Sequence, residues 1–409
     1  MIKGLSITSI AYTIKSNLIF KKVVSLLDFK EIFDLVEKTS EEYISVWEDV
    51  CNIESPTNYK EGVDKVGKYF ADLAEKHGWQ VEFCKQDKVG DVVCITMNPE
   101  ALEQPVTFSG HMDTVYPVGS FGDTPVTIKD GMIYGPGVAD CKGGVVAGFL
   151  AMDVLQKLGF TSRPVRLLLQ SDEENGSRLS QKATINYICE KAKDSVAFIN
   201  LEQHTRGEAC LQRKGIITFE FIVEGQESHS SRCAVSGANA IAEAAHKIIE
   251  IEKIKDDQGI TCCCSVIKGG TVVNTVPGNC EFKVNVRFAT AEQEAWIREY
   301  MQKIADTVYV EGCKTQLNIS SYRTSMQHTV KNEQLLNRIN ECLEKAELPQ
   351  LTASKRTGGS DAADVSAFGI PCVDSMGVVG GYIHSPKERA YIDSLAESAK
   401  RLVWVVKNI

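Results

Sequence analysis

The chain has 409 residues, of which 43% are hydrophobic, and carries a formal net charge of −9. This length exceeds what one hydrophobic core usually supports, so we expect two domains. The acidic balance and the lack of a basic cluster exclude nucleic acids and anionic membranes as expected partners, and favour a small-molecule substrate. No apolar run in the sequence approaches the length needed to span a bilayer.

Residues 1–25 are predicted to form an N-terminal extension that precedes the first amphipathic helix. The stretch 5–20 is moderately apolar, but Lys15 and Asn17 interrupt it and no small-x-small cleavage site follows. These features argue against a signal peptide.

The fourteen cysteines are scattered along the chain, and none forms a Cys-x-x-Cys pair. Neighbouring cysteines at 262–264 cannot readily bridge one another on one strand. We therefore expect reduced, mostly buried thiols and a cytoplasmic protein.

The first half of the chain alternates between helical and strand-like apolar spacing. Helices are predicted at residues 28–52, 58–77 and 142–158, and strands at 80–84, 91–97, 106–109, 164–170 and 196–201. This alternation predicts an α/β fold with a mostly parallel central sheet and helices on both faces.

Near residue 211 the pattern changes to that of a smaller α+β unit. Strands are predicted at 216–223, near 261, at 279–288 and at 315–320, with helices at 238–252 and 292–308. We expect an inserted domain at 211–322 that separates residues 26–210 from 323–409, the two parts of the larger domain, which carries the candidate metal ligands described next.

Candidate metal ligands begin at His111, which follows the apolar run at 106–108. The end of a strand in an open α/β sheet is where such sheets bind ligands. Asp113 is placed to hold the second ring nitrogen of His111, which is the usual support for a metal-bound histidine. Asp140 precedes a helix that starts with small residues, so its carboxylate can stand in the site without a bulky neighbour.

Further acidic and imidazole groups follow in chain order. Glu173 and Glu174 are adjacent in a loop after the strand at 164–170, so one can bind metal while the other acts on water. Glu202 follows the strand at 196–201, and His384 comes much later. Two histidines and three carboxylates suit a pair of zinc ions, although cobalt or manganese accepts the same ligands.

These motifs, at 110–117, 134–144 and 171–177, resemble the zinc amidohydrolase family of carboxypeptidase G, acetylornithine deacetylase, succinyl-diaminopimelate desuccinylase and aminoacylase. The carboxypeptidase G branch is the most similar. The resemblance implies that Asp140 bridges two metals, that His111 and Glu202 complete one site, and that Glu174 and His384 complete the other. It also implies that Glu173 is the general base.

The same resemblance implies roles for three residues of the insertion. His229 would donate to the oxyanion of the tetrahedral intermediate, and Asn274 and Arg287 would hold the carboxylate and carbonyl of the substrate. An arginine fork has the right geometry for a carboxylate. The insertion would serve as a lid and as the contact of a homodimer, in which His229 acts in its own active site or in that of the partner.

The expected reaction is hydrolysis of an amide or peptide bond next to a carboxylate-bearing residue, in a small peptide or an N-acyl amino acid. An aminopeptidase or dipeptidase of the same fold is the alternative, and it requires an acidic group for the free amine of its substrate. Glu202 stands where members that act on free amino termini tend to have aspartate, which favours the first reading. A non-catalytic binding protein of this fold would be expected to lack Glu173 or one of the metal ligands, whereas this sequence contains all of them.

Overall fold

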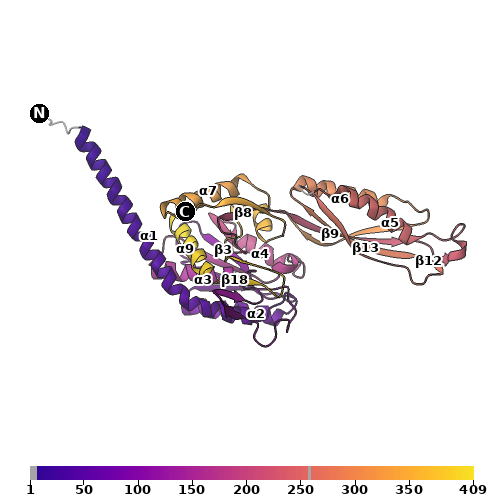
Figure 1. Ribbon diagram of the computed structural model, residues 1–409, viewed down its shortest axis with the longest axis horizontal. Coiled ribbons are helices and arrows are strands. Elements are labelled where there is room, and N and C mark those ends of the chain that lie inside the picture. The colour runs from indigo at the N-terminus through magenta and orange to yellow at the C-terminus, as the bar shows by residue number, and fades with distance from the viewer. Residues whose placement is uncertain (1–6, 257–258) are drawn as a thin grey trace.

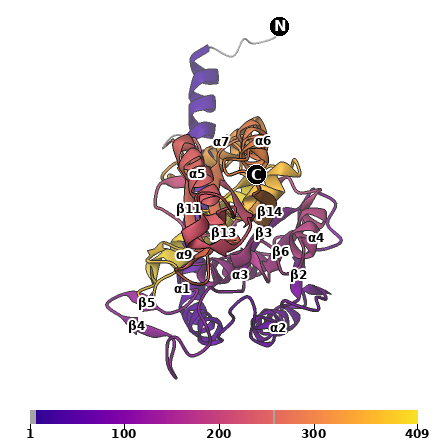
Figure 2. The same ribbon diagram turned by 90° about the vertical axis from the view of Figure 1, so that its right-hand side faces the viewer.

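The computed structural model describes residues 7–256 and 259–409, with side-chain surroundings from residue 29 onward. A larger body is joined to a narrower domain that extends from one side (Figure 1). Figure 2 looks along this narrower domain toward the body. Among the described residues, no helix combines the length and the apolar character that crossing a bilayer requires.

The body is built on a six-stranded sheet in the order β1-β2-β6-β3-β7-β16. Strands β6, β3, β7 and β16 run parallel, whereas β2 and β1 are antiparallel to their neighbours. The mostly parallel sheet is thereby confirmed. In chain order these strands are β1 (Gln80–Cys84), β2 (Val92–Met97), β3 (Val106–His111), β6 (Val165–Gln170), β7 (Ala197–Asn200) and β16 (Cys372–Val373).

Alternate residues of the central strands enter two different cores, because successive side chains of a strand point to opposite faces. On β6, Leu167 and Leu169 join the larger core, whereas Leu168 joins the smaller one. Helices therefore cover both faces of the sheet. The larger core involves α2 (Lys60–Lys76), α3 (Lys142–Lys157), α7 (Val330–Lys345) and α9 (Asp393–Asn408), and the smaller involves α4 (Ala183–Ala192) and α8 (Ala362–Ala367).

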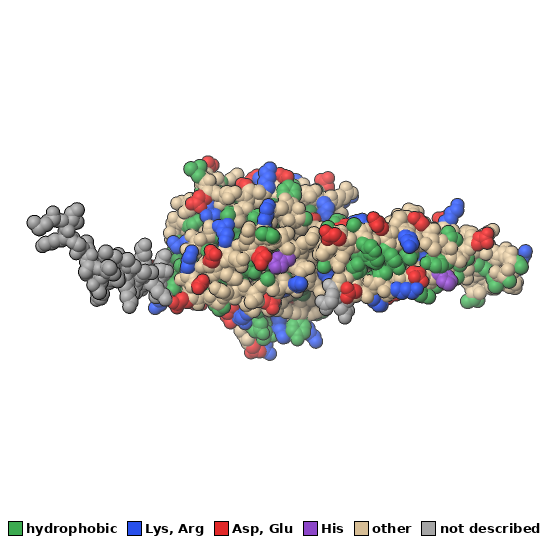
Figure 3. Space-filling model, turned by 90° about the horizontal axis from the view of Figure 1, so that it is seen from above, with side chains coloured by type: hydrophobic (Ala, Val, Ile, Leu, Met, Phe, Trp, Pro, Cys, Tyr) green, Lys and Arg blue, Asp and Glu red, His purple; other side chains and the backbone are tan. Residues whose placement is uncertain are grey.

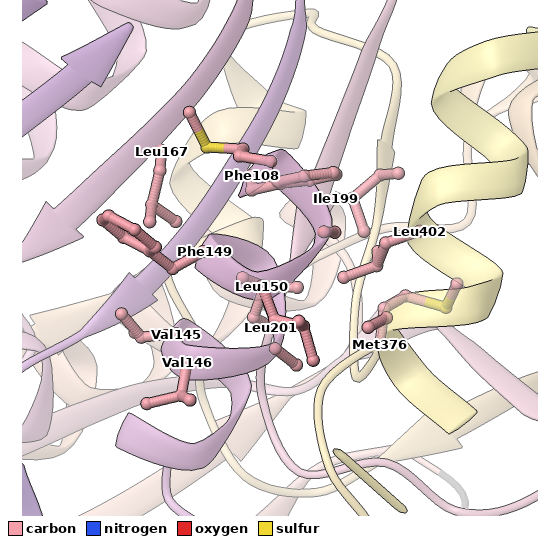
Figure 4. Packing of buried hydrophobic residues seen from close by; sticks show 14 of the residues in the cluster. Phe108, Val145, Val146, Phe149, Leu150, Leu167, Ile199, Leu201, Met376 and Leu402 are labelled. Atoms are coloured by element: carbon pink, nitrogen blue, oxygen red, sulfur yellow. The ribbon is translucent and has the colours of Figure 1, made fainter. Parts of the chain in front are cut away.

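Helix α3 is the most deeply buried helix element of the larger core. Figure 4 shows Leu150 on the side of α3 toward Leu402 of α9 and Phe149 on the side toward Leu167, and both belong to the same core as Phe108 of the sheet. Each of these side chains is fully buried, and burying one of them contributes roughly 1.5–3 kcal/mol. The packing fixes the start of α3, and with it the preceding Asp140.

Helix α1 spans Ile7–Asn52, so the helix begins inside the stretch that was predicted to precede it. Residues 1–6 of that predicted extension lie outside the described residues. No glycine or proline occurs within Ile7–Asn52, so nothing in the sequence interrupts the helix. Near its end, the buried Lys142 amine donates to the carbonyl oxygens of Val50 and Ile53, at 3.0 and 2.8 Å, which joins α1 to the start of α3.

The inserted part of the chain forms its own four-stranded antiparallel sheet in the order β11-β13-β9-β14. Its two helices pack on that sheet around a separate apolar core, which includes Phe219, Phe282 and Ile297. The elements are β9 (Gly215–Glu224), β10 (Ser228–His229), α5 (Ala240–Ile251), β11 (Thr261–Gly269), β12 (Thr275–Val276), β13 (Asn279–Phe288), α6 (Ala291–Asp306) and β14 (Lys314–Arg323).

Short elements complete the body and carry parts of the site. Strand β8 (Glu208–Arg213) pairs in parallel with β15 (Thr352–Arg356), so residue 211, the predicted start of the insertion, lies inside β8. A second small sheet has the order β17-β18-β5-β4. Its strands are β4 (Thr127–Lys129), β5 (Met132–Tyr134), β17 (Gly380–Gly381) and β18 (Arg389–Tyr391). The body also contains the short 3-10 helix η1 (Glu173–Asn175), whereas η2 (Ser230–Arg232) and η3 (Glu252–Ile254) belong to the inserted domain.

Candidate active site

Three neighbouring parallel strands end at the same edge of the central sheet and deliver candidate ligands there. His111 is the last residue of β3, Glu174 lies in η1 after β6, and Glu202 follows β7. Asp140 arrives just before α3, and His384 arrives on the loop between β17 and β18. The structure thus brings together all five side chains that the sequence suggested as metal ligands.

Asp140 stands between the two histidines, with one carboxylate oxygen toward each. Its Oδ1 lies 3.2 Å from Nε2 of His111, and its Oδ2 lies 3.1 Å from Nε2 of His384. Glu202 lies 3.8 Å from Nε2 of His111, whereas Glu174 lies 3.1 Å from Nε2 of His384. The five side chains therefore form two groups that share Asp140, an arrangement suited to two divalent ions bridged by one carboxylate.

The electrostatics of this cluster favour cations. Burial and the neighbouring charge of Asp140 raise the pKa of Glu174 to about 8, and they raise the pKa of Glu202 well above its usual value. Hydrogen bonds to Asp140 and Glu174 raise the pKa of His384 to about 11. Carboxylates crowded in this way retain protons that divalent ions would displace, so the residues present fit a pair of such ions.

Asp113 is fully buried beside His111 and also organises the loop that carries the two glutamates. The Nδ1 atom of His111 lies 3.0 Å from the Asp113 backbone oxygen and 3.4 Å from its carboxylate. That carboxylate accepts hydrogen bonds from the backbone N–H groups of Glu173 and Glu174, at 3.2 and 3.1 Å. Asp113 therefore links the orientation of an imidazole to the position of η1.

Glu173 lies at the wall of the site and is held by Arg323, which the sequence analysis did not single out. The Arg323 guanidinium donates to the Glu173 carboxylate and to the Glu173 backbone oxygen. Asp361 lies 3.9 Å from the same guanidinium. Burial and the charge of Glu173 raise the pKa of Asp361 to about 8. The buried guanidinium of Arg323 thus lies between two carboxyl groups, those of the candidate base Glu173 and of Asp361.

A cavity of about 820 Å³ opens beside the ligands, between the body and the base of the inserted domain. Arg287 lines it from β13 and donates to the backbone oxygen of Thr357 at 2.6 Å. Neither Arg287 nor Arg178 has an acidic partner among the residues that the structure describes. The acidic lining residues are Asp140, Glu173, Glu174 and Glu202, and the basic ones are Arg178, Arg213, Arg287 and Arg323.

His229 and Asn274 do not line this cavity. Both lie in the exposed region of β10 and β12, at the end of the inserted domain farthest from the body (Figure 1). They are close to each other, because the N–H of Ser230 donates to the backbone oxygen of Asn274 at 2.9 Å. The Nδ1 atom of His229 lies 2.8 Å from the hydroxyl of Ser231. Within one chain, the structure therefore separates these two residues from Arg287 and the ligands.

Arg213 is a second buried arginine that sequence reasoning missed. It forms an ion pair with Asp374, donates to the Ser375 hydroxyl at 3.2 Å, and lies 4.0 Å from Glu202. The sequence feature that could have indicated Arg213 is its position just after the mostly apolar residues 209–211, near the predicted domain boundary. An arginine in such a place is usually exposed, so only the fold shows that it faces the site.

All fourteen cysteines are free thiols. Cys141, next to the shared carboxylate, is fully buried, and its Sγ accepts the backbone N–H of His111 at 3.0 Å. Burial raises the pKa of the Cys141 thiol to about 12. The protonated thiol therefore packs against the end of β3.

His204, two residues after Glu202, gives a testable dependence of stability on pH. Its side chain is buried, Nδ1 lies 2.7 Å from the Ser375 backbone oxygen, and Nε2 has no partner among the described residues. Burial lowers the pKa of His204 from 6.5 to about 3. Below pH 6.5, His204 is therefore protonated in the unfolded chain but stays neutral in the folded protein. The free energy of unfolding consequently falls as the pH drops from 6.5 toward 3.

Between pH 7 and 5, we expect His204 to account for about 1–2 kcal/mol of the loss in free energy of unfolding. Urea denaturation of His204→Gln at both pH values should show a correspondingly smaller loss than the parent protein. The exposed His328, replaced by Gln, is the control and should leave the loss unchanged. Equal losses in the parent and His204→Gln would contradict the assignment.

The chain is similar to several known proteins in sequence and in fold. Over 372 residues the chain is 25% identical to carboxypeptidase G2 from Pseudomonas sp. (strain RS-16), covering 90% of this chain and 88% of that protein. It superposes on aminopeptidase PepT from Bacillus cereus ATCC 10987 with a TM-score of 0.72 and 20% identity, covering 90% and 98% of the two chains. The Bacillus subtilis YXEP protein, described as a dinuclear metal binding peptidase from the M20 family, gives a TM-score of 0.68 at 16% identity, covering 91% and 100%.

The model of a protein family described as Peptidase family M20/M25/M40 matches residues 107–408 of the chain. This span contains all five clustered side chains and Glu173. The resemblance expected from the motifs is thereby confirmed, as is the expectation of a metal-dependent enzyme. This chain belongs to the peptidase family M20/M25/M40 and is an enzyme of the metallopeptidase and amidohydrolase type.

Proposed function

We propose that this enzyme hydrolyses an amide or peptide bond next to a carboxylate-bearing residue, in the manner of a glutamate carboxypeptidase or an N-acyl amino acid deacylase. The observation that carries the proposal is the charge of the cavity wall. Arg178 and Arg287 face the cavity without acidic partners among the described residues, and a carboxylate of the substrate would satisfy them. A bidentate contact with Arg287 would align the scissile bond with the ligands.

In the proposed reaction, the five clustered side chains bind metal ions and Glu173 transfers the proton. Two divalent ions, zinc in our proposal with cobalt or manganese as alternatives, supply a Lewis acid and lower the pKa of water when bound. His111, Asp140 and Glu202 would hold one ion, and Asp140, Glu174 and His384 the other. Glu173 would take the proton from the attacking water and return it to the leaving nitrogen.

An aminopeptidase or dipeptidase reaction is the alternative, and the composition of the cavity argues against it. Such an enzyme needs an acidic group for the free amine of its substrate. The four acidic lining residues are already assigned, three as ligands and Glu173 as the base. Hydrolysis rates of N-acylated glutamate and of an unblocked dipeptide, measured with the metal-loaded enzyme, separate the two. A clear preference for the unblocked dipeptide would overturn the proposal.

The metal content provides a second test. We expect about two divalent ions per chain after reconstitution, because the ligands form two groups that share Asp140. Elemental analysis after removal of excess metal measures this directly. His384→Ala should leave about one ion, since it removes a ligand from only one group. No bound ion in the reconstituted parent protein would rule out the metal-dependent reaction.

We also propose that the enzyme is a cytoplasmic homodimer whose inserted domains contact each other. Strand β11 lies at the edge of its sheet, where an unpaired strand can accept another chain. Hydrophobic side chains gather on the surface of this domain (Figure 3), and Ile249 and Trp296 are among its exposed apolar residues. The free thiols support the cytoplasmic location, because they are typical of proteins in reducing compartments.

In such a dimer, His229 and Asn274 would complete the active site of the other copy. This assignment reconciles the roles that the resemblance implies with the exposed position of both residues at the far end of the inserted domain. His229 would then donate to the oxyanion, and Asn274 would act with Arg287 on the carbonyl and carboxylate of the substrate.

A further inference from the structure

Glu388 is a buried carboxylate to which the proposed reaction assigns no role. It lies just before β18 and is 1% exposed. Its Oε1 accepts the backbone N–H groups of Ala139 and Asp140, at 2.9 and 3.0 Å. Its Oε2 accepts the backbone N–H of Gly137 at 3.2 Å, and the Tyr116 hydroxyl lies 3.0 Å from the same oxygen. One side chain thus receives hydrogen bonds from most of the turn that ends at Asp140.

These contacts connect the three chain segments that carry His111, Asp140 and His384. Tyr116 lies five residues after His111, and Glu388 itself lies four residues after His384. The Tyr116 hydroxyl also lies 2.9 Å from the backbone oxygen of Ser385, next to His384. The segments are far apart in the sequence, so the spacing of the three ligands depends on contacts of this kind.

The turn at Gly137 explains why a carboxylate is needed there. Gly137 has a φ of +74°, which turns successive backbone N–H groups of the segment toward one point. The segment is buried, so these donors would remain unsatisfied without an acceptor, which would destabilise the turn. The carboxylate of Glu388 satisfies three of them at once.

We propose that Glu388 is a positioning residue for the metal site, which holds the backbone of Asp140 at the spacing that two ions require. This inference rests on the proposed function, because it concerns the ions that the five side chains would hold. Groups that orient metal ligands typically change metal affinity 10–100-fold when they are replaced. Glu388 would act on affinity through the backbone of the shared ligand, without touching metal or substrate.

The test compares zinc affinity in Glu388→Gln and in a matched control, by competition of the metal-free protein with a chromogenic chelator. The control is Glu243→Gln in the inserted domain. Glu243 is also 1% exposed and accepts two backbone N–H bonds, from Tyr309 and Val310 at 2.8 and 2.6 Å, where Glu388 accepts three. It also lies 3.0 Å from the buried amine of Lys247, so its replacement disturbs a buried site at least as strongly. Both replacements should lower the melting temperature of the metal-free protein, because each weakens a buried acceptor.

Only Glu388→Gln should weaken zinc binding, by about 10–100-fold. Zinc affinity equal to that of the parent, or equally weakened in both variants, would overturn the inference. If Glu388→Gln does not fold, the same zinc competition is measured with Tyr116→Phe. This variant removes one hydrogen bond from the Glu388 carboxylate and should weaken zinc binding by a smaller factor. Unchanged affinity in Tyr116→Phe would then count against the inference. Failure of the parent protein to bind zinc would instead contradict the proposed function.

Discussion

Replacement of Glu173 by Gln is expected to lower turnover by about two or more orders of magnitude while both metal ions stay bound. The amide cannot accept a proton from water, but its oxygen can still accept the hydrogen bond from Arg323 that positions residue 173. Steady-state kinetics and elemental analysis of the same preparation measure the two quantities together. Near-normal turnover in this variant would remove Glu173 as the base.

Glu174→Gln is the matched comparison, because residue 174 is adjacent in η1 and shares the backbone contact with Asp113. Here we expect loss of activity together with loss of about one ion, since a carboxylate ligand is removed. The two variants therefore separate proton transfer from metal binding. Equal metal loss in both would show that Glu173 acts as a ligand.

The second large effect is expected for His229. His229→Ala should lower turnover by ~10²–10³-fold, the usual cost of removing one oxyanion donor. A mixture of His229→Ala and Glu173→Gln chains should then regain activity. In hybrid dimers, one of the two active sites combines an intact Glu173 with an intact His229 from the other chain. Because the parent variants are both nearly inactive, the recovered activity would be visible in a simple rate assay.

This experiment requires that the two chains exchange partners. Differently tagged chains, purified through both tags in succession, would show that hybrid dimers have formed. Activity that remains at the level of the two variants in verified hybrids would show that His229 acts within its own chain or has no catalytic role. Recovery would support completion of the active site across the dimer contact.

Much of the fold could be predicted from the sequence because it depends on local patterns. Largely apolar runs such as Val165–Gln170 indicated buried strands, and their alternation with helices indicated the parallel sheet. Helix boundaries were close, as for α3, where 142–158 was predicted and Lys142–Lys157 is observed. The start of α1 was missed, because the moderately apolar stretch at 5–20 was interpreted as an extension that precedes the helix, although no glycine or proline interrupts Ile7–Asn52.

The five ligand candidates and Glu173 could also be predicted. Each stands in a short motif whose chemistry is visible in a few adjacent residues, and three of the candidate ligands lie at or just after the ends of strands that run parallel in one sheet. The carboxyl ends of parallel strands meet at one edge, so chain order alone implied that His111, Glu174 and Glu202 would meet.

The sequence by itself therefore determined the reaction type, the central sheet and the set of candidate ligands, because strand patterns and metal-binding motifs are local. Only the tertiary structure decided which distant groups surround them. Arg323 at Glu173, Arg213 at Glu202 and Glu388 at Asp140 are contacts between segments separated by many residues, and no spacing along the chain indicates them. The position of His229, at the end of the inserted domain farthest from the body, is likewise set by how that domain extends from the body (Figure 1), which no spacing along the chain indicates.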